Sequence, residues 1–142
     1  MRRHFEEIEE ELKGQFLSMA RLAEDMIAAA VQGLAERKRE PLEKVALIED
    51  EVNRLHIDID NRCLSLIALH QPAAADLRFI IAAIKINSDL ERIGDQAVNV
   101  SESTALLLDK PQLEHKLPVI PRMAALAQGM LKDSVAAFAN KD

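Results

Sequence analysis

Several residue types are scarce or absent in this 142-residue chain, and each scarcity excludes a class of protein. Tryptophan and tyrosine are absent, and aromatic residues make up 3% of the sequence. Strands favour aromatic and β-branched residues, so this composition disfavours a β-rich fold. A single cysteine, Cys63, rules out a disulfide within the chain and fits a reducing compartment.

Long apolar runs are also missing. No uninterrupted apolar run is longer than the one at residues 79–84, which is far too short for a membrane-spanning helix. The chain starts MRRHFEEIEEE, without the apolar core of a signal peptide, so we expect a cytoplasmic protein. The net charge of −6, with acids and bases interspersed, argues against a nucleic-acid partner. The one basic cluster, at 37–39, falls where a first helix should end, and cations there interact favourably with the helix dipole.

Hydrophobic periodicity divides the chain into four helical segments separated by prolines. They cover residues 3–38, Pro41 to the break at Pro72, residues 73–108 and residues 122–140. The stripe of the second segment is expected to stay buried as far as Leu69. Short connections between long amphipathic helices favour antiparallel neighbours, so the sequence predicts an all-α, up-and-down helical bundle.

The fourth segment repeats part of the first. Shifting residues 19–35 by 104 positions gives seven identities in seventeen positions, which indicates the start of a second copy of a three-helix unit. We therefore divide the chain into a first three-helix repeat over 1–109, a proline-containing connection over 110–121, and the first helix of an incomplete second repeat over 122–142.

An apolar stripe runs along this fourth helix. It consists of Met123, Leu126, Met130, Ala137 and Phe138. Soluble monomers rarely expose such a patch, so the helix should either fold back onto its own bundle or cross to another copy. Because the prolines stiffen the connection and favour exchange, we expect a homodimer or higher oligomer with the fourth helix at the interface.

Oxygen-bearing side chains recur at four-residue spacing in the third segment, at Asn87, Glu91, Asp95 and Asn99. Successive positions of this kind lie above one another on a helix, so Glu91 and Asp95 can present two carboxylates to one cation. Paired oxygens suit hard metals such as ferric iron, manganese, magnesium or calcium. On spacing alone, a solvated acidic stripe is the more common explanation.

The second segment carries a counterpart to this pair. Glu49 and Asn53 have the same spacing and lie on a helix that should run antiparallel to the third. Asp50 and Asp89 are weaker candidates, as is Asn99.

Other motifs carry less information. His56 and Asp60 are four residues apart, but a lone helical histidine is more often a surface or satisfied core residue. Acids surround Arg78 and Arg92, which favours structural ion pairs over phosphate binding. We find no catalytic constellation, no inward Glu-x-x-His motif and no glycine-rich phosphate loop, so we expect no enzyme.

Two short sequence motifs, QPAAADLR at 71–78 and DLERIGD at 89–95, resemble the signature of the PhoU family, cytoplasmic regulators of bacterial phosphate uptake. The resemblance covers essentially the whole chain. It implies two tandem three-helix bundles, the second of which stops here after its first helix. It also implies contacts with the phosphate ABC transporter and a membrane-bound sensor histidine kinase.

The resemblance further implies a metal site, because Glu/Asp-x-x-x-Asp motifs of the family support iron or zinc clusters. It makes Glu91 and Asp95 the first candidate ligands, with Glu49 and Asn53 next. Asn53 stands where the family usually has Asp, and a neutral amide oxygen is a weaker ligand. The alternative is an iron-binding helical-bundle metalloprotein or metalloenzyme, although the absence of histidine ligands argues against redox chemistry.

Overall fold

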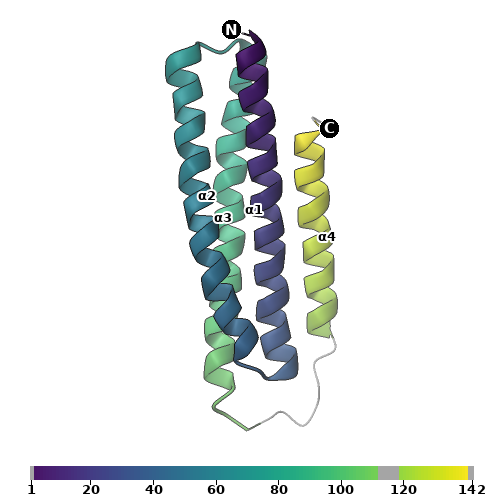
Figure 1. Cartoon of the computed structure of the whole chain (residues 1–142). Helices are drawn as coiled ribbons and strands as arrows, with labels where there is room; N and C mark the ends of the chain where they lie inside the picture. The colour runs from purple at the N-terminus through teal and green to yellow at the C-terminus, as the bar shows by residue number, and fades with distance from the viewer. Residues whose placement is uncertain (1, 112–118, 141–142) are drawn as a thin grey trace.

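The computed structural model describes residues 2–111 and 119–140, and within these ranges it contains helices and no strand. The helices are α1 (Arg2–Glu36), α2 (Glu40–His70), α3 (Ala74–Leu107) and α4 (Val119–Ala139). Successive helices run in opposite directions, and α1, α2 and α3 form a bundle with α4 beside α1 (Figure 1). The predicted all-α, up-and-down bundle is confirmed. Among the described residues, no helix combines the length and apolarity needed to cross a membrane.

Local backbone chemistry explains where the helices begin and end. Arg37 and Gln71 both have positive φ, 53° and 41°, and these left-handed residues end α1 and α2. Pro41 occupies the first turn of α2, where its missing N–H costs no hydrogen bond. The first turn of α4 accommodates Pro121 in the same way. Helix α4 therefore begins at Val119 and not at the predicted residue 122. Most of the predicted connection lies outside the described residues.

The core of the bundle centres on α1, which packs against all three other helices. Leu12, Phe16, Met19 and Met26 of α1 are completely buried. Burial of a side chain of this size stabilises the fold by about 1.5–3 kcal/mol relative to exposure. The prediction for Leu69 is wrong, because it lies in the last turn of α2 at the end of the bundle and is 74% exposed.

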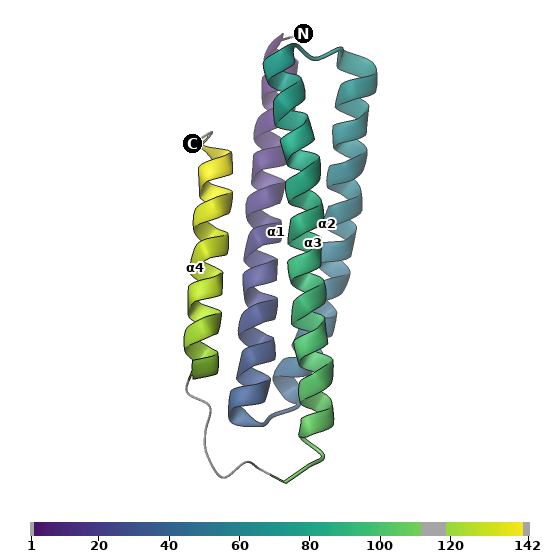
Figure 2. The ribbon, with the colours of Figure 1, turned by 180° about the vertical axis from the view of Figure 1, so that it is seen from behind.

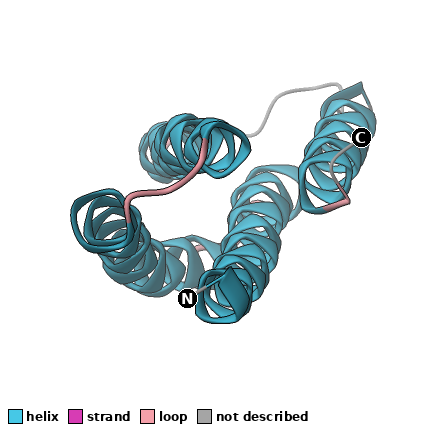
Figure 3. Cartoon of the chain, turned by 90° about the horizontal axis from the view of Figure 1, so that it is seen from above, coloured by secondary structure: helices cyan, strands magenta, loops and turns pink. Residues whose placement is uncertain are grey.

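Helix α4 packs along one side of α1 (Figures 2 and 3). Leu131 and Val135 are buried there, and Gln128 Nε2 donates a hydrogen bond of 2.9 Å to the Glu24 carbonyl. Residues 24 and 128 are equivalent under the 104-residue shift, so the contact joins matching positions of the two repeats. Within the single chain, α4 therefore folds back onto its own bundle, and the predicted oligomer remains a prediction.

The stripe predicted on α4 divides into a covered and an exposed part. Phe138 stacks on Phe79 of α3 at 5.1 Å between ring centroids and meets Phe16 of α1 edge-on at 5.4 Å. Met123, Leu126 and Met130 are 58–71% exposed.

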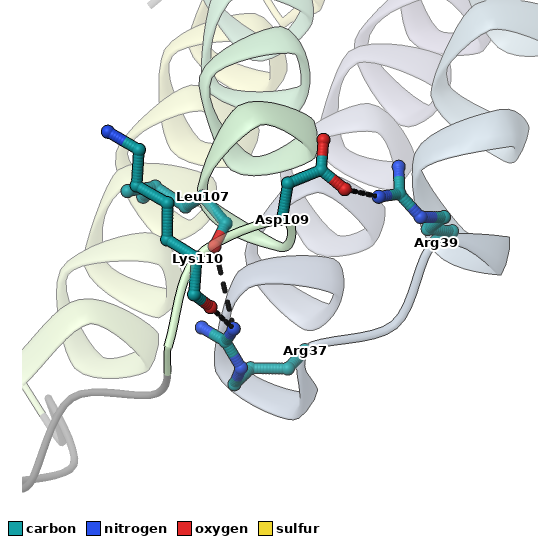
Figure 4. A network of polar contacts seen from close by, with 5 residues as sticks. All are labelled: Arg37, Arg39, Leu107, Asp109 and Lys110. Atoms are coloured by element: carbon teal, nitrogen blue, oxygen red, sulfur yellow. Dashed lines mark hydrogen bonds and ion pairs between the residues drawn. The ribbon is translucent and has the colours of Figure 1, made fainter.

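The basic cluster at the end of α1 interacts with a different helix from the one we expected (Figure 4). Arg37 Nη2 donates to the carbonyl oxygens of Lys110, at 2.7 Å, and Leu107, at 3.5 Å. Arg39 forms an ion pair with Asp109. These cations therefore satisfy the carboxyl end of α3, because the turn after α1 places them beside it.

Candidate functional site

The antiparallel α2 and α3 bring Glu49 of α2 near enough to Asp95 of α3 for the charge of Asp95 to act on the Glu49 carboxylate. Partial burial raises the pKa of Glu49 above its usual value. The negative charges of Asp95, Asp50 and Glu102 raise this pKa further, in that order. The α2–α3 face therefore concentrates negative charge around Glu49.

Glu91 has a partner that we did not predict. Its Oε2 lies 2.7 Å from His56 Nε2, and the same nitrogen lies 3.6 Å from Asp60 Oδ2. The four-residue spacing of His56 and Asp60 on α2 can be read from the sequence. Sequence spacing could not show that this pair faces Glu91, since that depends on how α2 and α3 align.

Asn87 lies inside the bundle and not on the acidic face. It is fully buried, and its Nδ2 donates hydrogen bonds of 2.9 Å to the His56 carbonyl and to Asp60 Oδ1. Four residues exceed one helical turn by about 40°, so the row from Asn87 to Asn99 rotates by about 120° around α3. Asn99 consequently ends up exposed, and the four predicted oxygen donors do not share one face.

The remaining candidates are exposed. Asn53 and Asp50 lie on the solvent side of α2. Asp89 is paired with Arg92 at 3.8 Å between Oδ1 and Nη1, which agrees with the structural role expected for that arginine.

The donor set between α2 and α3 is suited to hard cations, because it consists mainly of carboxylate oxygens. The pKa of Glu49 is raised first by burial and then by the neighbouring negative charges, and a bound cation would offset both effects. As the side chains stand, no three His, Cys, Asp or Glu residues in the described part of the chain are arranged around one metal position. The metal site therefore stays a prediction, supported by the charge of the face and not by a preformed cage.

Cys63 offers no reactive nucleophile. Burial raises its pKa to about 11, with a further contribution from the charge of Asp60, so the thiol is protonated at neutral pH. Only the thiolate form of cysteine is strongly nucleophilic or metal-binding.

Comparison with known proteins identifies the fold and the family. The family model described as "PhoU domain" matches residues 16–104. A PhoU homolog of the phosphate-specific transport system from Aquifex aeolicus is 40% identical over 138 residues, which cover 97% of this chain and 62% of the relative. A second homolog, from Caulobacter vibrioides, is 33% identical over 131 residues, covering 92% of this chain and 57% of the relative.

The crystal structure of PhoU from Pseudomonas aeruginosa has the same architecture. It matches with a TM-score of 0.91 at 31% sequence identity, over 97% of this chain and 66% of that one. The chain thus spans about three-fifths of the length of the curated relatives it matches. Because the family model matches residues 16–104, which is more than half of the chain, the chain belongs to the PhoU family.

Proposed function

We propose that this protein is a regulatory accessory component of bacterial phosphate uptake. The match of the PhoU domain to residues 16–104 carries this proposal. Curated relatives that align with almost the whole chain are named as accessory proteins of the phosphate-specific transport system. The proposed role is regulation by binding, without catalytic turnover.

Two partners are proposed on the family resemblance, the phosphate ABC transporter and a sensor histidine kinase. Long helical faces suit such contacts, because they offer extended side-chain surfaces of fixed spacing. Exposed apolar residues are present on the outer side of α2, where Leu47, Ile57 and Leu64 are 57–71% exposed.

A complementation experiment tests the regulatory role. A bacterium that lacks its own PhoU protein should express a phosphate-starvation reporter even in phosphate-rich medium, and this chain should restore repression. Co-purification from the same cells should recover the transporter or the kinase. Normal chain levels with no repression and no partner recovery would contradict the proposal.

The metal site is a second, separable part of the proposal. Glu91 and Asp95 are the first proposed ligands, with Glu49 and Asn53 next, and the metal would neutralise the acidic face and join α2 to α3. Elemental analysis of protein purified without chelator should find iron or zinc. The Glu91→Ala, Asp95→Ala double variant should lose it, while a control that removes two exposed acids elsewhere, Asp25→Ala with Asp133→Ala, should keep it. Equal metal content in all three proteins would overturn the assignment.

A further inference from the structure

An open hollow of about 560 Å³ lies between α1 and α2. Its lining comes from Ser18, Arg21 and Leu22 of α1 and from Glu51, Arg54, Leu55 and Asp58 of α2. None of these residues belongs to the acidic α2–α3 face, so the hollow is a separate feature of the bundle.

The two arginines of the hollow are available to a ligand. Within the described part of the chain, neither Arg21 nor Arg54 forms a hydrogen bond or ion pair, even though Glu51 and Asp58 line the same hollow. Elsewhere on the same pair of helices, Arg62 does pair with Glu11 at 2.7 Å. Among the described residues, the α1–α2 interface thus forms an ion pair at Arg62 and leaves the guanidinium groups of Arg21 and Arg54 without a protein partner.

We propose that the hollow binds inorganic phosphate. Guanidinium groups present forked N–H donors that match phosphate oxygens, and the Ser18 hydroxyl adds a donor that can rotate to suit. Leu22 and Leu55, both half-buried, supply the apolar part of the lining. Two positive and two negative side chains make the site nearly neutral, which favours one small anion over a polyanion.

The carboxylates of Glu51 and Asp58 determine which anion fits. A carboxylate is an acceptor only, so it stabilises an anion that still carries an O–H and repels one that does not. Inorganic phosphate keeps at least one proton at neutral pH, whereas sulfate has none. The second pKa of a phosphomonoester is about 6, so its phosphate group has largely lost its last proton by pH 7.5. The site should therefore prefer inorganic phosphate to sulfate and to a phosphomonoester.

Chemical-shift titration of the isotope-labelled chain at pH 7.5 and constant ionic strength tests this proposal. Inorganic phosphate should give saturable shifts that are centred on the hollow, and sulfate and glycerol phosphate should bind more weakly. Arg21→Gln and Arg54→Gln should each weaken phosphate binding by about tenfold or more, the loss expected for a charged hydrogen-bonding group. The matched control Arg78→Gln, at an exposed arginine on α3, should change it by less than about twofold.

The double variant Glu51→Gln, Asp58→Asn tests the selectivity separately. It should bind both anions more tightly, because two negative charges are removed, but its preference for phosphate over sulfate should shrink. Absence of saturable phosphate binding, equal binding of sulfate by the parent chain, or equal losses in Arg54→Gln and Arg78→Gln would each overturn the proposal. Circular dichroism melting of every variant shows that a loss of binding is not a loss of fold.

Discussion

At the scale of single residues, the α2–α3 interface contains polar groups that stabilise the fold and polar groups that destabilise it. Asn87 joins the two helices through hydrogen bonds to His56 and Asp60, and a buried amide of this kind specifies the register of packed helices. Glu49 destabilises the fold, because its carboxylate is partly desolvated and lies near other acids. The acidic face is therefore a local cost to stability, and it adds to the cost of His56 Nδ1 and Asn87 Oδ1, which are buried in the same interface without a hydrogen-bond partner among the described residues.

This cost predicts that Glu49→Gln stabilises the protein at neutral pH. A pKa raised in the folded state means that ionised Glu49 is less favourable there than in the unfolded chain. The gain from Gln should be present above the raised pKa and should vanish as the pH falls below 4.5, the ordinary value, where both states are protonated. Thermal unfolding measured across this pH range checks the prediction.

Glu43→Gln is a matched control for this experiment. Glu43 lies in the first turn of α2, where the helix dipole favours a negative charge, so removing that charge should slightly lower stability at pH 7. A lower melting temperature for Glu49→Gln than for the parent at pH 7 would contradict the assigned electrostatics.

At the scale of helices, two glycines of α1 occupy opposite environments. A Cβ added at Gly14 would meet nothing within 4 Å. A Cβ added at Gly33 would collide with the Leu42 side chain and lie 3.2 Å from the Lys38 carbonyl oxygen. Gly33 therefore lets the first turn of α2 pack directly against the end of α1, whereas Gly14 has no such role.

The two glycines predict opposite effects of the same substitution. Gly14→Ala should stabilise the chain by about 0.5–1 kcal/mol, since alanine is the better helix former. Gly33→Ala gains the same propensity but must displace Leu42, so we expect net destabilisation of about 1 kcal/mol or more. Urea unfolding of the two variants measures the difference. Equal stabilisation by both would show that α2 does not approach α1 so closely.

At the scale of the whole molecule, α4 contacts the bundle along one face only. Leu131 and Val135 cover that face, while Met123, Leu126 and Met130 form an exposed apolar stripe on the other. Such a stripe on a soluble protein favours association. The fold-back seen within one chain and the oligomer expected from the sequence are compatible, because the stripe is still available after α4 has packed on α1.

We therefore predict that two or more chains associate through α4. Light scattering coupled to size exclusion should give a mass above 15.8 kDa that falls on dilution. Leu126→Gln with Met130→Gln should shift the mass to 15.8 kDa without loss of helix content. Leu47→Gln with Leu64→Gln, at similarly exposed positions of α2, should leave the association unchanged. A parent chain that stays at the monomer mass at high concentration would contradict this prediction.

Part of the candidate site could be predicted, because the spacing of residues on one helix face depends only on the nearby sequence. The positions of Glu49 and Asp95 on facing helices follow from periodicity and from the antiparallel arrangement. The partner of Glu91 does not, since the contact with His56 depends on the axial offset between α2 and α3. The burial of Asn87 was also missed, because a row of four-residue steps drifts around the helix and only the packed bundle shows where it enters the core.

The sequence by itself determined the number of helices, most of their limits and the family, because hydrophobic period, proline and turn chemistry act over a few residues. Only the tertiary structure decided which separate segments meet. It placed Arg37 and Arg39 at the end of α3, inserted Phe138 between Phe16 and Phe79, and left Arg21 and Arg54 in one hollow. Contacts of this kind depend on the relative rotation and offset of whole helices, which the packing of many side chains sets together.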